Sequence, residues 1–154
     1  MVPGLLIVAA GLFWAAQLHG DSSYVSVILP AELLIGFGLG WVMAPAMNYA
    51  THGVSSDDAG VASATVNTAQ QIGASIGTAL LNTIATTATA TYLATHRPTP
   101  AVHAEALAHG FTRGFTVAGV IAVVAALIVA ALMNTPRPQR ETADTESAVP
   151  VPVG

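Results

Sequence analysis

The chain has no cysteine, no lysine and few charged side chains of either sign. Without cysteine it can form no disulfide bond and no thiolate metal site. Its four basic residues besides histidine are all arginines, and they form no basic patch of the kind that binds nucleic acid. Charged residues make up 8% of the 154 residues, whereas a soluble domain carries about 25%. Together with 53% hydrophobic residues and a mean hydropathy of +0.65, this indicates an integral membrane protein.

Apolar runs divide the sequence into four segments that are long enough, or nearly so, to cross a membrane. Crossing the hydrocarbon core takes about 20 residues of helix. The predicted spans cover residues 3–18, 27–50, 59–85 and 113–133. The first is slightly short, and no positive charge precedes it, which favours a transmembrane helix over a secretory signal. The sequence therefore predicts an all-α fold, an integral membrane bundle of four transmembrane helices within residues 1–133.

The longest polar connection between spans covers residues 94–112. It is predicted to hold one short helix at the membrane surface over about 100–109, with Thr99 as its N-cap and Gly110 as its stop. Charges and prolines without an apolar period follow the last span. Residues 134–154 are therefore predicted to be a disordered tail.

The third span is rich in small and amide side chains, with Asn67, Gln70 and Gln71 as its polar centre. A helix that only anchors a protein in lipid would consist mainly of Leu, Ile, Val and Phe. Small and amide residues instead suit a helix that packs closely on others or faces a polar cavity. One face at i, i+3 and i+4 spacing carries Ser63, Asn67, Gln70, Ala74, Gly77 and Leu81. The amides are predicted either to line a substrate path or to hydrogen bond to a neighbouring helix.

Two pairs of glycines are predicted to be helix-packing sites. Gly36 and Gly40 lie about one helical turn apart in the second span, and Gly73 and Gly77 repeat this spacing in the third. Because glycine has no side chain, such a pair lets the backbone of a neighbouring helix approach closely.

Glu32 is the only acidic residue inside a predicted span. Because a charge within a membrane helix is costly, an ionisable residue there is a candidate functional site. Here the candidate ligand is a proton or a cationic substrate. Alternatively, Glu32 lies near the membrane surface just after Pro30, in the first turns of its helix, where the helix dipole favours a carboxylate.

No catalytic, metal or cofactor site is predicted. The spacing of His96, His103 and His109 does not place all three on one helix face, and only Glu105 is available to complete a metal-binding set. These histidines are expected to be solvated in the polar connection. No nucleophile is paired with a base, and no phosphate-binding loop is present, so an enzyme is not expected.

Two stretches resemble the major facilitator superfamily: LLIGFGLGWVMAPAMNYA at 33–50 and DDAGVASATVNTAQQIGASIGTALLNTI at 57–84. The resemblance is to the C-terminal end of fourteen-span drug:proton antiporters of the EmrB/QacA type. In that family a glycine-rich helix with a late proline is followed by an acidic cap, a run of small residues and an N-T-x-x-Q-x-G-x-S-x-G-x-A pattern. Here that pattern comprises Asn67, Thr68, Gln71, Gly73, Ser75, Gly77 and Ala79.

The resemblance implies the last four spans of a multi-pass transporter in a bacterial plasma (inner) membrane, with both termini and the tail in the cytoplasm. It implies membrane lipid, protons and a small amphipathic substrate as partners, together with N-terminal helices that this sequence lacks, so a fragment or one piece of a split transporter is expected.

The expected function is therefore the C-terminal portion of a secondary active transporter. Such a protein would perform multidrug efflux by proton antiport and alternating access. Two alternatives remain open. One is a self-standing membrane scaffold that pairs through its glycine faces. The other is a small four-helix exporter that works as an oligomer with Glu32 as its proton site.

Overall fold

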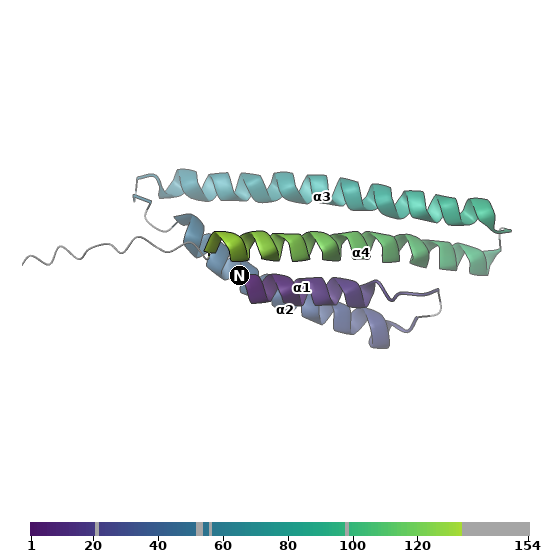
Figure 1. The fold of residues 1–154 in the computed structure, drawn as a ribbon. Coiled ribbons are helices and arrows are strands. Elements are labelled where there is room, and N and C mark those ends of the chain that lie inside the picture. Colours follow the sequence, from purple (N-terminus) through teal and green to yellow (C-terminus); the bar gives the residue numbers. More distant parts are fainter. Residues whose placement is uncertain (21, 52–53, 56, 98, 134–154) are drawn as a thin grey trace, which may run out of the picture.

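A computed structural model describes residues 1–20, 22–51, 54–55, 57–97 and 99–133. Within these ranges four helices make up the bundle, and one short π-helical turn precedes the second (Figure 1). In chain order the elements are α1 Val2–Ala15, η1 Tyr24–Ile28, α2 Leu29–Thr51, α3 Ala59–Thr95 and α4 Pro100–Met133. The described ranges contain no β-strand, and the all-α prediction is confirmed. The tail predicted over 134–154 lies outside the described residues.

Two of the four described helices are long and apolar enough to cross a membrane, judged by length and composition. They are the stretch Tyr24–Tyr49, through η1 and α2, and the stretch Pro100–Leu132 in α4. α1 is apolar but has only 14 residues. α3 has 37 residues, which is ample length, but its amides and hydroxyls lower its hydropathy. The spans at α1 and α3 therefore stay predictions.

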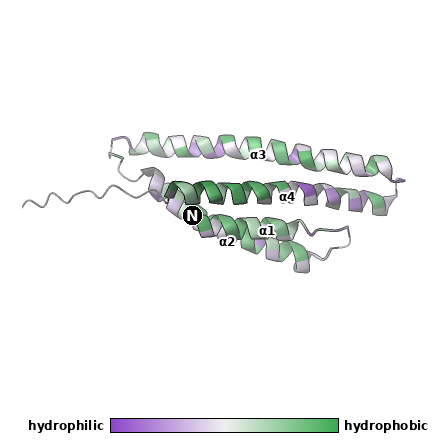
Figure 2. Cartoon of the chain, viewed as in Figure 1, coloured by the Kyte–Doolittle hydropathy of each residue, from purple (hydrophilic) through white to green (hydrophobic). Residues whose placement is uncertain are grey.

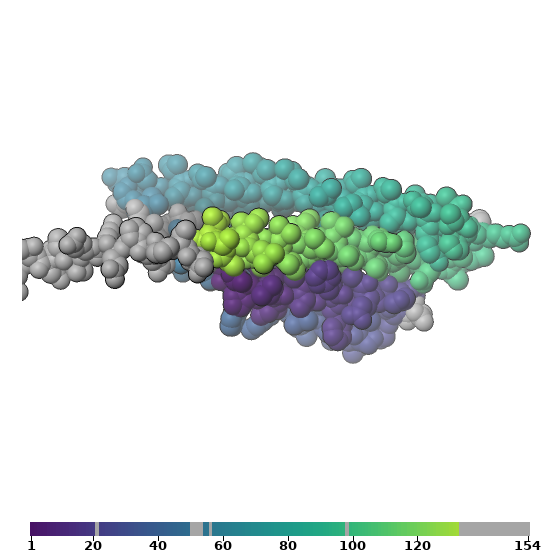
Figure 3. All heavy atoms as spheres, in the orientation of Figure 1, coloured from purple at the N-terminus to yellow at the C-terminus, as the bar shows by residue number. Residues whose placement is uncertain are grey.

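α4 lies in the middle of the bundle, with α3 on one side and α1 on the other (Figures 1 and 3). α1 pairs closely with α2, and α2 also meets α3. At 37 and 34 residues, α3 and α4 are each about 50–55 Å long. The C-terminal end of α3 and the N-terminal end of α4 lie together and extend beyond α1 and α2 (Figure 1). Figure 2 shows that the C-terminal half of α4 is strongly hydrophobic, whereas the half near Pro100 carries polar residues.

Close packing between α1 and α2 depends on a glycine that the sequence pattern does not single out. A Cβ atom on Gly38 would lie 2.8 Å from the carbonyl oxygen of Gly4 and from the backbone nitrogen of Val8. The predicted packing glycines Gly36 and Gly40 would have no atom within 4 Å of such a Cβ. Helical geometry explains the difference, because residues two positions apart point to nearly opposite faces. The Gly36–Gly40 face therefore packs on nothing in the described part of this chain.

α4 is continuous where the sequence predicts a break. The predicted helix over 100–109 and the predicted span over 113–133 form one helix, and Gly110 does not end it. Gly110 instead faces α3, where an added Cβ would lie 2.5 Å from the carbonyl oxygen of Ala85 and would overlap the hydroxyl of Thr89. The glycine that suggests a helix stop is thus a site of close contact between two helices.

Both long helices begin at residues suited to capping. Thr99 Oγ1 accepts a hydrogen bond from the backbone nitrogen of Val102 at 3.2 Å, as the sequence predicts. α3 follows Asp58, whose carboxylate makes no capping hydrogen bond to the helix and instead accepts one from Ser55 Oγ at 2.9 Å. A negative charge at this position also suits the positive end of the helix dipole.

Candidate functional site

Most hydroxyl groups on α3 bond to the backbone of their own helix. Thr68 Oγ1 donates to the carbonyl oxygen of Ala64 at 2.9 Å, and Ser75 Oγ donates to that of Gln71 at 2.8 Å. The same bond to the carbonyl four residues earlier is made by Thr65, Thr83, Thr86, Thr89, Thr91 and Thr95. These hydroxyls need no partner on another helix. α3 is therefore less polar than its composition indicates.

The amide side chains on α3 lack such a partner, and we call the three that lie close together, Asn67, Gln70 and Gln71, the amide stripe. Asn67 and Gln71 make no side-chain hydrogen bond within the described part of the chain. Gln70 Nε2 reaches the sulfur of Met43 on α2 at 3.9 Å, and a thioether is a weak acceptor. Unbonded amides are costly in hydrocarbon. The amide stripe therefore requires water, another protein group or a ligand.

The amide stripe points to the same side of α3 as the residues that pack on α4. Leu81 lies on the same face about four turns further along, and it lines a cavity together with Phe111 and Phe115 of α4. The part of the face around Leu81 is covered by α4. In contrast, every side chain from 67 to 76 is exposed. In Figure 2 this part of α3 is more polar than the neighbouring half of α4. The amide stripe thus lines an uncovered surface beside α2 and α4.

The second pair of predicted packing glycines lies in the same part of α3. A Cβ atom on Gly73 or Gly77 would have no neighbour within 4 Å. Ser63, which is predicted to share a face with Asn67 and Gln70, is half-buried. Among the described residues nothing packs closely on either glycine pair, so both faces are open to helices from outside this bundle.

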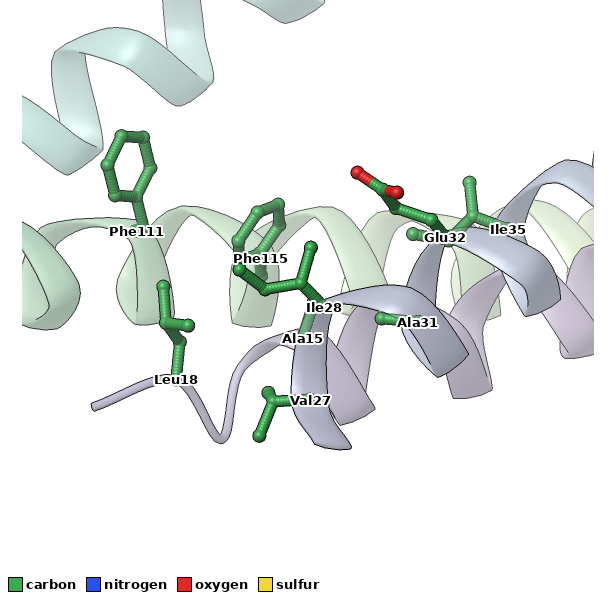
Figure 4. A pocket seen from close by; sticks show the side chains of 9 residues that line it. All are labelled: Ala15, Leu18, Val27, Ile28, Ala31, Glu32, Ile35, Phe111 and Phe115. Carbon is green, nitrogen blue, oxygen red and sulfur yellow. The ribbon is translucent and has the colours of Figure 1, made fainter. Parts of the chain in front are cut away.

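Glu32 lies in the first turn of α2 and lines a half-open cavity (Figure 4). The hydroxyl of Tyr24 donates a hydrogen bond to Glu32 Oε2 at 3.1 Å. No basic side chain in the described ranges pairs with this carboxylate. Both predicted roles, a proton or cation site and a carboxylate at a helix N-terminus, are compatible with this position.

Aromatic contacts join the ends of α3 and α4. The ring centroid of Tyr92 lies 4.1 Å from that of His96, which stacks on it, and 5.3 Å from that of His109. His96 and His103 are exposed, as expected, but His109 is half-buried. Its Nδ1 atom is buried and has no hydrogen-bond partner among the described residues. The sequence gives no signal for this contact, because it depends on how two helices meet.

Two hydrogen bonds tie the turn after α1 to α4. The backbone nitrogen of Gly20 donates to Glu105 Oε2 at 2.9 Å, and Thr112 Oγ1 donates to the carbonyl oxygen of Leu18 at 3.1 Å. Both join residues far apart in the sequence, so neither is predicted from local pattern. They fix α4 against the α1–α2 turn beside the Glu32 cavity, which Leu18 also lines.

The absence of native cysteine allows the exposure of the amide stripe to be tested directly. In membrane vesicles, Asn67→Cys and Gln71→Cys are expected to react with a membrane-impermeant maleimide, because the reactive thiolate forms in contact with water. Ile72→Cys and Ile76→Cys, exposed on the opposite face of α3, are expected to stay unlabelled in lipid. Labelling confined to the isoleucine positions, or absent from both pairs, would contradict a water-lined stripe.

Comparison with known proteins gives two relatives. The puromycin resistance protein of Streptomyces alboniger is 44% identical over 79 residues, which are 50% of this chain and 16% of that protein. The cephamycin export protein of Amycolatopsis lactamdurans is 40% identical over 74 residues, which are 48% of this chain and 15% of that protein. No family model and no solved structure matches the chain.

The matched part of the chain spans about one-sixth of the length of either relative. Among the described residues of the whole chain, two helices have the length and composition of membrane spans. The chain is therefore similar, over about half its length, to proteins of antibiotic resistance and export, and its apolar helices point to a membrane location.

Proposed function

We propose that this chain supplies the C-terminal helices of a bacterial exporter of small amphipathic compounds, a member of the major facilitator superfamily. In this arrangement all four helices cross the membrane and both termini lie in the cytoplasm. Three observations support the proposal: the relatives named for resistance and export, the two apolar helices, and the sequence pattern over 33–84.

The amide stripe is the structural observation that carries the proposed path for a substrate. A helix that only anchors a protein can satisfy its polar groups internally, as the hydroxyls of α3 do. The three amides are instead left open on the side of α3 that faces α2 and α4. A few hydrogen-bonding groups in a largely apolar wall are what a binding path for an amphipathic compound needs.

We infer that transport proceeds by alternating access, in which two groups of helices rock about a central site. α4 packs on both α1 and α3 and would hold the amide stripe in a fixed position beside α2. Hydrogen bonds to the substrate would form while the site is open to one side and break when it opens to the other. The proton gradient would supply the energy, since one charge moved is worth about 2.3 kcal/mol per 100 mV.

The proposed exporter includes helices beyond those described in this chain. The faces at Gly36 and Gly40 on α2 and at Gly73 and Gly77 on α3 have room for a neighbouring backbone. Further helices would pack there, and membrane lipid would surround the rest. The four helices alone are not expected to transport, because they enclose no complete path.

An exchange of helices with a relative tests the proposal. We expect puromycin resistance from a chimera of the puromycin resistance protein in which whole helices of this chain, α3 included, replace the helices to which they align. The chain expressed alone is expected to give no resistance. The measurement is the lowest inhibitory puromycin concentration in a sensitive bacterium, with the amount of each protein in the membrane fraction determined in parallel.

The relative itself and the empty vector set the limits of this assay. A chimera that reaches the membrane in the same amount as the relative but gives no resistance would count against the proposal. Resistance from this chain alone, lost on Glu32→Gln, would instead support the small oligomeric exporter.

A further inference from the structure

A cavity near the α1–α2 turn combines a single carboxylate with apolar walls. Its volume is roughly 300 Å³, and its lining comes from the end of α1, from η1 and α2, and from α4 (Figure 4). Glu32 is the only charged residue in the lining, and the others are aliphatic or aromatic, including Ile28, Phe111 and Phe115. Small-ligand sites have this character, with mainly apolar walls, few polar groups and volumes from about 300 Å³.

The carboxylate of Glu32 is held in position but is not neutralised. Its Oε2 atom accepts a hydrogen bond from the hydroxyl of Tyr24 at 3.1 Å. Its other oxygen has no hydrogen-bond partner, and no arginine or histidine pairs with it, in the part of the chain that the structure describes. A carboxylate accepts several hydrogen bonds, and the Glu32 side chain is exposed. Glu32 therefore offers the cavity a free acceptor and an uncompensated negative charge.

The wall beside Glu32 is formed partly by a π-helical turn. η1 contributes Ile28 to the lining and carries Tyr24, whose hydroxyl positions the carboxylate. Turns of this kind are rare and occur frequently at functional sites. The hydrogen bonds of Gly20 and Thr112 hold the adjoining turn against α4. The walls that come from different helices are thus tied to one another.

We propose that this cavity binds a primary ammonium group attached to an apolar tail. The ammonium bonds to the free oxygen of Glu32, and the tail lies against the two phenylalanines of α4. The negative charge selects a cation, and the free acceptor selects one with N–H donors, which a quaternary ammonium lacks. A free alkylamine and an aminophospholipid both have this chemistry. The cavity is separate from the amide stripe, and binding there does not depend on export.

Binding of dodecylamine to the full chain in phosphatidylcholine nanodiscs tests the proposal, with native mass spectrometry measuring the fraction of protein that retains one ligand. Dodecylamine is expected to bind about tenfold or more tightly than dodecyltrimethylammonium, since a hydrogen bond to a charged group is lost with the latter. Glu32→Gln is expected to reduce this preference, because the amide keeps the shape of the side chain and an acceptor oxygen but loses the charge that makes a hydrogen bond to an ammonium strong. Asp57→Asn, which removes a carboxylate outside the cavity, is expected to preserve it.

Equal binding of the two ligands by the unsubstituted chain would overturn the proposal, and this comparison does not require any variant to fold. Retention of the full preference by a Glu32→Gln variant with unchanged helical content in circular dichroism would also overturn it. Either result would leave the export proposal intact, because resistance of the chimera is measured independently.

Nanodiscs that contain phosphatidylethanolamine distinguish the two sources of the ammonium group. If this lipid competes with dodecylamine and is retained by the unsubstituted chain but not by Glu32→Gln, the site holds a lipid. If dodecylamine binding is unaffected by the lipid, the site holds a free amine. Both results support an ammonium site. The proposal would be refuted if the unsubstituted chain and Glu32→Gln retained phosphatidylethanolamine and phosphatidylcholine equally and neither protein preferred dodecylamine.

Discussion

Leucine at Asn67 or Gln71 is expected to lower the puromycin resistance conferred by the chimera by about 3- to 30-fold for each hydrogen bond lost. This range follows from the value of such bonds in membranes, about 0.6–2 kcal/mol each. Leucine keeps roughly the size of the amide side chain but removes its donors and acceptor. The measurement is the lowest inhibitory concentration at matched amounts of protein in the membrane.

Thr68→Val is the matched control for the two amide substitutions. Thr68 is adjacent to Asn67, but its hydroxyl is already bonded to the carbonyl oxygen of Ala64. Its loss is expected to leave resistance unchanged. An equal effect of all three substitutions would argue against a special role for the amides. If Asn67→Leu lowers resistance but Asn67→Cys is not labelled by maleimide, the amides act in packing and not in the path.

Alanine at Gly110 is expected to destabilise the contact between α3 and α4. The added methyl group would meet the backbone of α3, since its position lies 2.5 Å from the carbonyl oxygen of Ala85 and overlaps the hydroxyl of Thr89. A backbone atom cannot rotate away, so the helices must separate. Overpacking of this kind costs about 1–3 kcal/mol. The measurement is the thermal unfolding midpoint of the purified chain in nanodiscs, followed by circular dichroism.

Gly36→Ala provides the comparison with the same chemical change. A Cβ atom there has no neighbour within 4 Å, and alanine in place of glycine stabilises an open helix position by up to about 1 kcal/mol. The two variants are therefore expected to shift the unfolding midpoint in opposite directions. An unfolding midpoint for Gly110→Ala at or above that of Gly36→Ala would show that the α3–α4 contact is not as close as the structure has it.

The candidate site could be predicted from the sequence only in part. The i, i+3, i+4 spacing on the third span places Asn67 and Gln70 on one face, and the structure shows that this face lies beside α2 and α4 and is uncovered. Composition alone could not separate these amides from the hydroxyls of the same helix. The separation comes from hydrogen bonding, because threonine and serine reach the carbonyl four residues back, whereas the amides of the stripe make no such bond.

The sequence by itself determined the all-α fold and where most of the helices begin, because hydropathy, charge content and helical periodicity are properties of local sequence. It did not determine that α4 runs unbroken through Gly110. Tertiary structure decided which glycines pack. Gly38 and Gly110 face neighbouring helices, whereas Gly36 and Gly40 face open space. It also decided that the carboxylate of Glu32 has Tyr24 as a partner and a cavity beside it. Such facts depend on the rotation of each helix about its axis and on what lies opposite, and no local pattern specifies either.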